Sequence, residues 1–199
     1  MKKSICILLV TAALASCGPS TRIINSWRDP QVVVKTGEIN KFMVAALLKN
    51  QSVRRLEEDH MASLYPGKAI QSYIEFGSEE LKENEDAYNQ KLKAEGYDGV
   101  VVMRLVNVEK NTRYVPGSYP LYYNTWHGYW RYSWPGFYDP GFYTTDKTYE
   151  VEVTVYSLRR NKLIWTCITS TVNPPGRGEL FDSVIRTVNE KMKKQGFIQ

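Results

Sequence analysis

The chain has 199 residues, 43% of them hydrophobic, and a formal net charge of +5. This length suits one domain, or one domain with an appended segment. The charge is only weakly basic and is not gathered into blocks of Lys and Arg, which argues against a nucleic-acid-binding protein.

The first residues have the pattern of a bacterial lipoprotein signal peptide. Lys2 and Lys3 precede a mostly apolar, uncharged run at residues 4–15, which fits a signal peptide and is too short to span a bilayer. The Leu-Ala-Ser-Cys sequence that ends at Cys17 resembles the lipobox, in which the Cys thiolate accepts a diacylglyceryl group. We expect residues 1–16 to be removed, which lowers the net charge to +3 through the loss of both lysines. In the alternative, this is an ordinary secretory signal and Cys17 is incidental.

Lipidation at Cys17, by diacylglycerol and an N-acyl chain, would hold the protein on a membrane without a spanning segment. Residues 17–22 form a short tether, and no second apolar run of spanning length follows. Gly18, in place of the Asp that retains enterobacterial lipoproteins at the inner membrane, indicates the outer membrane, facing the periplasm. Since Cys6 leaves with the signal, Cys167 has no disulfide partner, and we expect it to be a buried, unreactive thiol.

Hydrophobic periodicity then predicts one domain over residues 23–199. The predicted elements are a strand at 23–27, a strand at 41–49, a helix at 50–64, a strand at 68–76, a helix at 84–95, a strand at 98–108, a hairpin of 148–158 and 163–172, and a helix at 178–194. The apolar stripe of the first helix comprises Val53, Leu56, His60, Met61 and Leu64, and that of the last helix comprises Phe181, Val184, Ile185, Val188 and Met192. This order predicts an α+β fold, with a mixed, largely antiparallel sheet and helices packed on one face.

Two tracts carry a resemblance to a known fold. The tract EGYDGVVVMRLVNVEK contains Gly96 and Asp98, and the tract KTYEVEVTVYSLRRNKLIWTCITST contains Lys162 and Trp165. Together they resemble the end of the small α/β domain of curli-secretion lipoproteins, of the Tol propeller protein's amino-terminal domain and of lipoprotein activators of peptidoglycan synthases. The Trp-x-Asp-Pro sequence that begins at Trp27 also resembles the start of an uncharacterised lipoprotein group. The resemblance implies this fold and the cell envelope, and it transfers no catalytic residue.

An aromatic insertion, at residues 110–146, interrupts the predicted sheet. Residues 114–143 hold thirteen aromatic side chains between Pro and Gly residues and follow no helical or strand period, so we expect a loop. Ten of them form the candidate contact surface: Tyr122, Tyr123, Trp126, Tyr129, Trp130, Trp134, Phe137, Tyr138, Phe142 and Tyr143. Three interpretations stay open: a low-complexity loop whose rings collapse together, an adhesive surface for proteins or sugars, and a seat at the membrane interface.

The remaining candidates for chemistry are weak. His60 and His127 have no Cys or His partner at metal-ligand spacing, and Asp29 fits a turn before Pro30. Glu150 and Glu152 share a strand face, which fits solvated alternation better than acid–base catalysis. The glycines on either side of Arg177 could place a phosphate at a helix N-terminus, but no longer glycine pattern supports this.

The sequence therefore predicts a non-enzymatic lipoprotein that binds another envelope protein in the periplasm. The alternatives are a glycan- or peptidoglycan-binding module that uses Trp126, Trp130 and Trp134 as stacking platforms, and, more remotely, a hydrolase whose site is not located. No metal or cofactor is expected beyond the lipid on Cys17. The membrane is the expected partner through that lipid, nucleic acid is not expected, and nothing in the sequence indicates an oligomeric state.

Overall fold

The computed structural model describes residues 20–35, 38–76, 85–117, 125–128, 130–131 and 141–198. The signal peptide and Cys17 lie outside these residues, so lipidation stays a prediction. The chain divides into two compact units, and the second of them comprises Glu109–Thr148. The first unit contains the described residues up to Val108 and those from Tyr149 onward.

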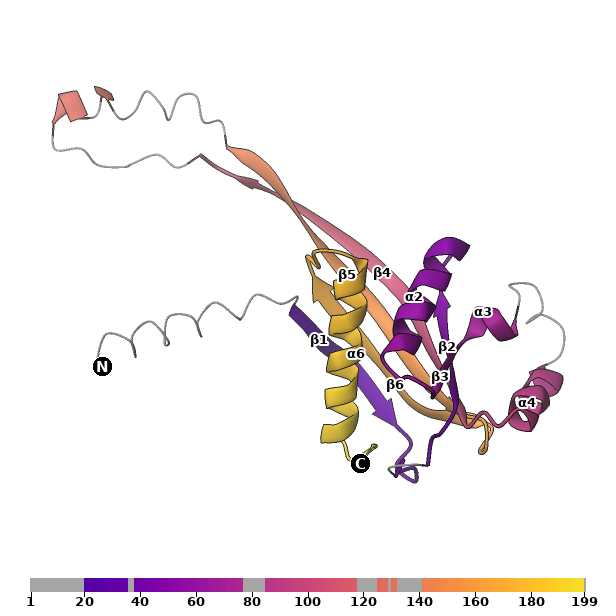
Figure 1. The fold of residues 1–199 in the computed structure, drawn as a ribbon. Coiled ribbons are helices and arrows are strands. Elements are labelled where there is room, and N and C mark those ends of the chain that lie inside the picture. Colours follow the sequence, from indigo (N-terminus) through magenta and orange to yellow (C-terminus); the bar gives the residue numbers. More distant parts are fainter. Residues whose placement is uncertain are drawn as a thin grey trace, which may run out of the picture. The chain divides into compact units, whose positions relative to one another are not determined.

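Six strands form a single sheet (Figure 1). They are β1 (Ser20–Arg28), β2 (Phe42–Leu47), β3 (Ala69–Gln71), β4 (Gly99–Val115), β5 (Phe142–Ser157) and β6 (Lys162–Val172). Their order is β1-β6-β5-β4-β2-β3, in which β1 is antiparallel to β6, and β2 is parallel to both β3 and β4. The predicted α+β fold with a mixed, mostly antiparallel sheet is therefore confirmed.

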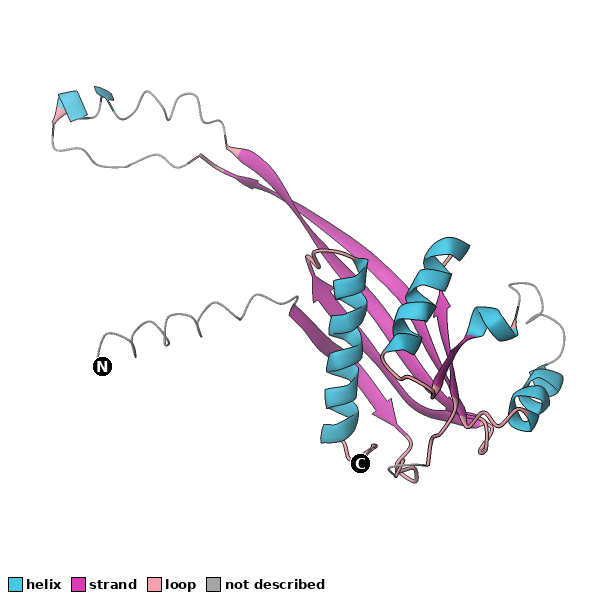
Figure 2. Cartoon of the chain, viewed as in Figure 1, coloured by secondary structure: helices cyan, strands magenta, loops and turns pink. Residues whose placement is uncertain are grey.

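Two helices, α2 (Gln51–Ser63) and α6 (Arg177–Lys194), lie side by side against one face of the sheet (Figure 2). The main core lies between them and the sheet, and it includes Val44, Val151, Val153, Met61 and Val184. The predicted stripe of α6 is confirmed, because Phe181, Val184, Val188 and Met192 are buried and Ile185 packs against them.

The predicted stripe of α2 is confirmed at Met61, which is buried in the main core, and wrong at Leu56 and Leu64. Leu56 and Leu64 are exposed, whereas Arg54, Glu57 and Glu58 are buried. The physical reason is a satisfied polar cluster, in which Glu58 accepts hydrogen bonds from Arg54 Nε at 2.9 Å and from Ser72 Oγ at 2.7 Å. Burial of a charge is tolerated when it is paired and hydrogen-bonded in this way.

A second, smaller cluster packs Phe76, Leu92, Tyr97 and Leu158 around Met43. Met43 precedes Val44 of the main core, and successive residues of a strand point to opposite faces, so this cluster lies on the other side of β2. Helix α4 (Glu85–Ala94) contributes Leu92 to it. The strand predicted at 68–76 is wrong in its second half, which forms the single-turn helix α3 (Ser72–Glu75) after the short β3.

The loop predicted for the aromatic insertion is wrong at both of its ends. Strand β4 continues to Val115, beyond its predicted end at residue 108, and β5 begins at Phe142, before its predicted start at residue 148. The reason is cross-strand pairing: the hydroxyls of Thr112 and Thr145 lie 2.9 Å apart, and Arg113 Nε lies 3.7 Å from Asp146 Oδ2. Such pairs stabilise a two-stranded ribbon, which a search for hydrophobic alternation misses because both of its faces are polar or aromatic.

Candidate functional site

The aromatic ribbon, formed by residues 109–115 and 142–148 of the second unit, contains two of the predicted contact residues, Phe142 and Tyr143, and adds Tyr114, which was not among them. The rings of Tyr114 and Tyr143 lie 5.3 Å apart, with an angle of 54° between their planes. Tyr114 is 50% exposed, Phe142 62% and Tyr143 75%. Three large rings therefore present their faces or edges to solvent on paired strands, which is the composition of a contact surface.

Gly141 sets the close approach of the two strands at this position. Its φ is +77°, and a Cβ atom there would lie 2.4 Å from the carbonyl oxygen of Val115 and 2.6 Å from the hydroxyl of Tyr114. Only glycine fits both the backbone conformation and the space. The position of the Tyr114 ring therefore depends on a residue without a side chain.

Two more of the predicted contact residues are described, in the short segment at residues 125–131. Trp126 is 79% exposed and meets His127 edge-on, with ring centroids 5.9 Å apart, and Trp130 is 61% exposed. The other six lie outside the described residues: Tyr122, Tyr123, Tyr129, Trp134, Phe137 and Tyr138. Within the described part of the chain, no group of three or more His, Cys, Asp or Glu side chains is placed to hold a metal ion.

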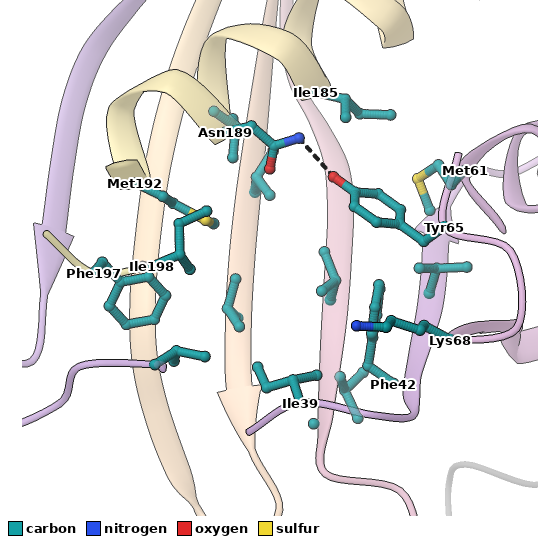
Figure 3. Close-up of a pocket in the computed structure, with 18 of the residues that line it drawn as sticks. Ile39, Phe42, Met61, Tyr65, Lys68, Ile185, Asn189, Met192, Phe197 and Ile198 are labelled. Carbon is teal, nitrogen blue, oxygen red and sulfur yellow. Dashed lines mark hydrogen bonds between the residues drawn. The ribbon is translucent and has the colours of Figure 1, made fainter. Parts of the chain in front are cut away.

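The sequence did not indicate the second candidate site, an apolar pocket between α2 and α6 in the first unit (Figure 3). Its volume is about 250 Å³. The sheet supplies Val44, Val101 and Val153 to its walls, α6 supplies Ile185, Val188 and Met192, and Met61 and Tyr65 close the side toward α2. Sequence analysis had assigned these aliphatic residues to the core, because a helix stripe that packs fully and one that leaves a hollow have the same pattern.

The polar groups of the pocket are few. Asn189 Nδ2 donates a hydrogen bond to the Tyr65 hydroxyl at 2.6 Å, so these two groups satisfy each other. The exposed Lys35 and Lys68 lie at its edge, and no Asp or Glu is among its lining residues. The pocket opens to solvent, so in the absence of a ligand its aliphatic walls are in contact with water, which is unfavourable for apolar surface. A bound apolar group would remove that apolar surface from water.

The other sequence candidates have structural roles. Asp29 Oδ1 accepts a hydrogen bond from the Gln31 amide at 2.9 Å, which confirms the turn, and Oδ2 forms an ion pair with Lys162. The hydrogen bond with Lys162, followed by that from Gln31, holds the pKa of the Asp29 carboxyl below its usual value. His60 Nε2 lies 2.7 Å from Asp182 Oδ1 and so connects α2 to α6.

The paired carboxylates and the lone thiol show no catalytic arrangement. Glu152 pairs with Arg104 at 2.7 Å on the exposed face of the hairpin. Cys167 is buried, as expected, and burial raises the pKa of its thiol to about 12, so it is not a nucleophile near neutral pH. At the N-terminus of α6, the carboxylate of Glu179 lies beside Gly176, since a Cβ there would meet Glu179 Oε2 at 2.6 Å.

Comparisons with known proteins give distant likenesses only. No protein-family model matches the chain, and no curated protein matches it significantly. The solved structure of the PelC dodecamer from Paraburkholderia phytofirmans is similar at a TM-score of 0.38 and 7% identity, over 83% of this chain and 90% of that one. Lipoprotein GNA1162 from Neisseria meningitidis is similar at a TM-score of 0.39 and 10% identity, over 77% of this chain and 98% of that one. At such distances no residue role is carried over. Among the described helices, none combines the length and apolarity needed to cross a bilayer.

Proposed function

We propose that this protein is a non-enzymatic lipoprotein of the bacterial outer membrane, anchored through Cys17, that binds another envelope protein in the periplasm through its aromatic ribbon. The observation that carries the proposal is the exposure of Tyr114, Phe142 and Tyr143 on paired strands. Burial of such rings in an interface supplies much of its binding energy, and Tyr in particular is enriched among hot spots.

The paired strands support binding in a second way. Strand pairing already restricts the backbone under the rings, and the Tyr114–Tyr143 contact restricts their side chains. Less conformational entropy is then lost when a partner binds. A non-enzymatic role is consistent with the structural use of Asp29, His60 and Glu152 in ion pairs and hydrogen bonds.

Crosslinking in intact cells, followed by identification of the trapped proteins, tests this proposal. We expect the wild-type chain to trap a specific envelope protein and the Tyr114→Ala/Phe142→Ala/Tyr143→Ala variant to lose it. The matched control is Thr112→Val/Thr145→Val, which changes a polar pair of the same ribbon and keeps the rings. Equal trapping by all three chains would reject the ribbon as the contact surface.

The anchor needs its own measurement. Labelling of cells with a radioactive fatty acid should mark the wild-type chain, and Cys17→Ser should abolish the label and move the protein out of the membrane fraction. Separation of inner and outer membranes then gives the location. Label that persists in Cys17→Ser would mean that the lipid is elsewhere, and a wild-type chain without label would mean that the signal is an ordinary secretory one.

Glycan binding is the second candidate, because Trp126 and Trp130 are largely exposed and indole rings stack on sugar faces. Sedimentation with purified peptidoglycan separates the two candidates. If glycan is the ligand, the wild-type protein pellets with the wall and the Trp126→Ala/Trp130→Ala/Trp134→Ala variant does not. Unchanged pelleting of this variant would reject the proposal that these Trp residues bind glycan. The proposal of a protein partner would not be affected by that result.

A further inference from the structure

We propose that the pocket between α2 and α6 binds one acyl chain of a free long-chain carboxylate, with its carboxylate at Lys35 and Lys68. The site belongs to the first unit and does not depend on the aromatic ribbon or on the function proposed for it. Three features of the pocket lead to this ligand: its size, the few polar groups in its walls, and the sign of the charge at its edge.

The size of the pocket fits an apolar chain. About 250 Å³ exceeds the roughly 150 Å³ of an engineered core cavity that stays dry and binds benzene. The walls come mainly from Val, Ile and Met side chains, including Val101, Ile185, Val188 and Met192. Aliphatic walls of this kind suit a flexible methylene chain, and each methylene group that leaves water contributes favourably.

The polar groups exclude most other small ligands. Only Tyr65 and Asn189 bring uncharged polar side chains to the pocket, and they are hydrogen-bonded to each other at 2.6 Å. A sugar or a nucleotide would bring several donors and acceptors into a wall that cannot satisfy them, which costs free energy for each group. A chain whose polar atoms all lie at one end avoids this cost.

The edge of the pocket favours an anion at that end. Lys68 follows the Pro66-Gly67 turn and Lys35 follows β1, and both side chains are exposed. In Figure 3 the ammonium group of Lys68 points toward the interior, below the Tyr65 ring. No carboxylate lines the pocket itself, and the nearby carboxylate of Glu38, which accepts a hydrogen bond from the Lys35 backbone N–H at 3.0 Å, also pairs with Arg160 at 4.0 Å. A carboxylate placed between Lys35 and Lys68 would gain charge-assisted hydrogen bonds while its chain lies among the valines and isoleucines.

Photolabelling in isolated membranes that contain the full-length lipoprotein tests the proposal. A clickable diazirine fatty acid is added without ATP and coenzyme A, so that it is not built into other lipids, and the labelled peptides are mapped. We expect label on the α6 peptide that contains Ile185 to Met192. Excess unlabelled dodecanoate should compete about two- to fivefold better than dodecanol, which has the same chain without the charge.

Two variants test separately how the ligand's acyl chain and its carboxylate contribute to binding. Val188→Trp fills the pocket and should reduce labelling at least tenfold. Lys35→Ala/Lys68→Ala changes two exposed side chains, keeps the core, and should weaken labelling by about two- to fivefold, as expected for exposed ion pairs. Because Val188→Trp could also unfold the protein, its thermal unfolding is measured beside that of the lysine variant, and the lysine variant alone tests the charge.

Several results would overturn the assignment. A second hollow of about 240 Å³ lies at the opposite ends of the same helices and is lined by Val53, Leu180 and Phe181. Label that maps there, or equally to the exposed Ile74, would mean that this pocket is not the site. Equal competition by dodecanol would show that the carboxylate does not contribute to binding. Labelling by a diazirine phospholipid but not by the free acid would identify the ligand as a membrane lipid.

Discussion

The side chains of Asp29 and Lys162 form an ion pair that connects the turn after β1 to the first residue of β6. Each residue belongs to one of the two short motifs that carried the family resemblance, Trp-x-Asp-Pro and Lys-x-x-Trp. Trp165 of the second motif is fully buried, and its indole N–H donates to Gln195 Oε1 at 2.9 Å. The two motifs therefore meet at one end of the β1–β6 pair and contribute to the fold.

Asp29→Asn should lower the free energy of unfolding at neutral pH, because the variant keeps an acceptor for Gln31 but loses the charge that pairs with Lys162. The pKa of Asp29 lies below its usual value in the folded protein, so its stabilising contribution is present above that usual value and is lost as the pH falls through the lowered pKa. Urea denaturation followed by Trp fluorescence should show a difference between the two chains at pH 7 that disappears in acid.

The control for this measurement is Asp146→Asn, which removes the charge of a more exposed pair with Arg113 at 3.7 Å. We expect it to leave stability unchanged, as is usual for exposed ion pairs. Similar losses in both variants, or a loss in Asp29→Asn that persists in acid, would contradict the role assigned to the Asp29–Lys162 pair.

Glu58→Ala should destabilise the protein by about 3–5 kcal/mol, because Arg54 would stay buried without its partner. Two backbone amides, those of Ala46 and Tyr73, would also lose their acceptor. The Arg54→Leu/Glu58→Leu variant should lose less than the sum of its two single variants, since no charge remains uncompensated. Additive losses in this double-mutant cycle, measured by chemical denaturation, would show that the two side chains act independently.

Two glycine substitutions should have opposite effects. A Cβ on Gly99 would lie 2.7 Å from the carbonyl oxygen of Tyr156, so Gly99→Ala forces β4 and β5 apart and should cost about 1–3 kcal/mol. Gly178 in α6 has open space around it, and Gly178→Ala should stabilise by about 0.4–1 kcal/mol because the unfolded chain loses freedom. Thermal unfolding gives both values, and a tolerated Gly99→Ala would mean that the strands can separate without cost.

Cys167 should resist alkylation in the folded protein. With its pKa raised to about 12 by burial, only about one thiol in ten thousand is ionised at pH 8, and the side chain is also inaccessible. Iodoacetamide treatment followed by mass spectrometry should leave the Cys167 peptide unmodified until urea unfolds the chain. Rapid modification of the native protein would show that β6 opens locally.

Most elements of the fold could be predicted, because their signals are local. The stripe of α6 and the alternation of Val151, Val153 and Val155 each follow from the period of one element, and the structure confirms both. The stripe of α2 was predicted correctly at Met61 but not at its charged members, because Arg54, Glu57 and Glu58 were counted as exposed. The Arg54–Glu58 pair is buried only because Ser72 and two backbone amides, distant in sequence, satisfy it.

The candidate sites, like the fold, have some features that the sequence predicts and others that it does not. The aromatic content of the insertion and the lipobox predicted at Cys17 follow from residue types alone, since both depend on composition and short motifs. The contact between the rings of Tyr114 and Tyr143 could not be predicted from the sequence, because it depends on the register of two strands separated by the insertion.

The sequence by itself determined the expected anchor, the α+β class and the aromatic insertion, because composition and periodicity are properties of the unfolded chain. Only the tertiary structure decided how far β4 and β5 extend, which face of α2 is buried, and that α2 and α6 leave a pocket between them. Each of these depends on the distance between side chains that are far apart in the sequence, and such distances exist only once the chain has packed.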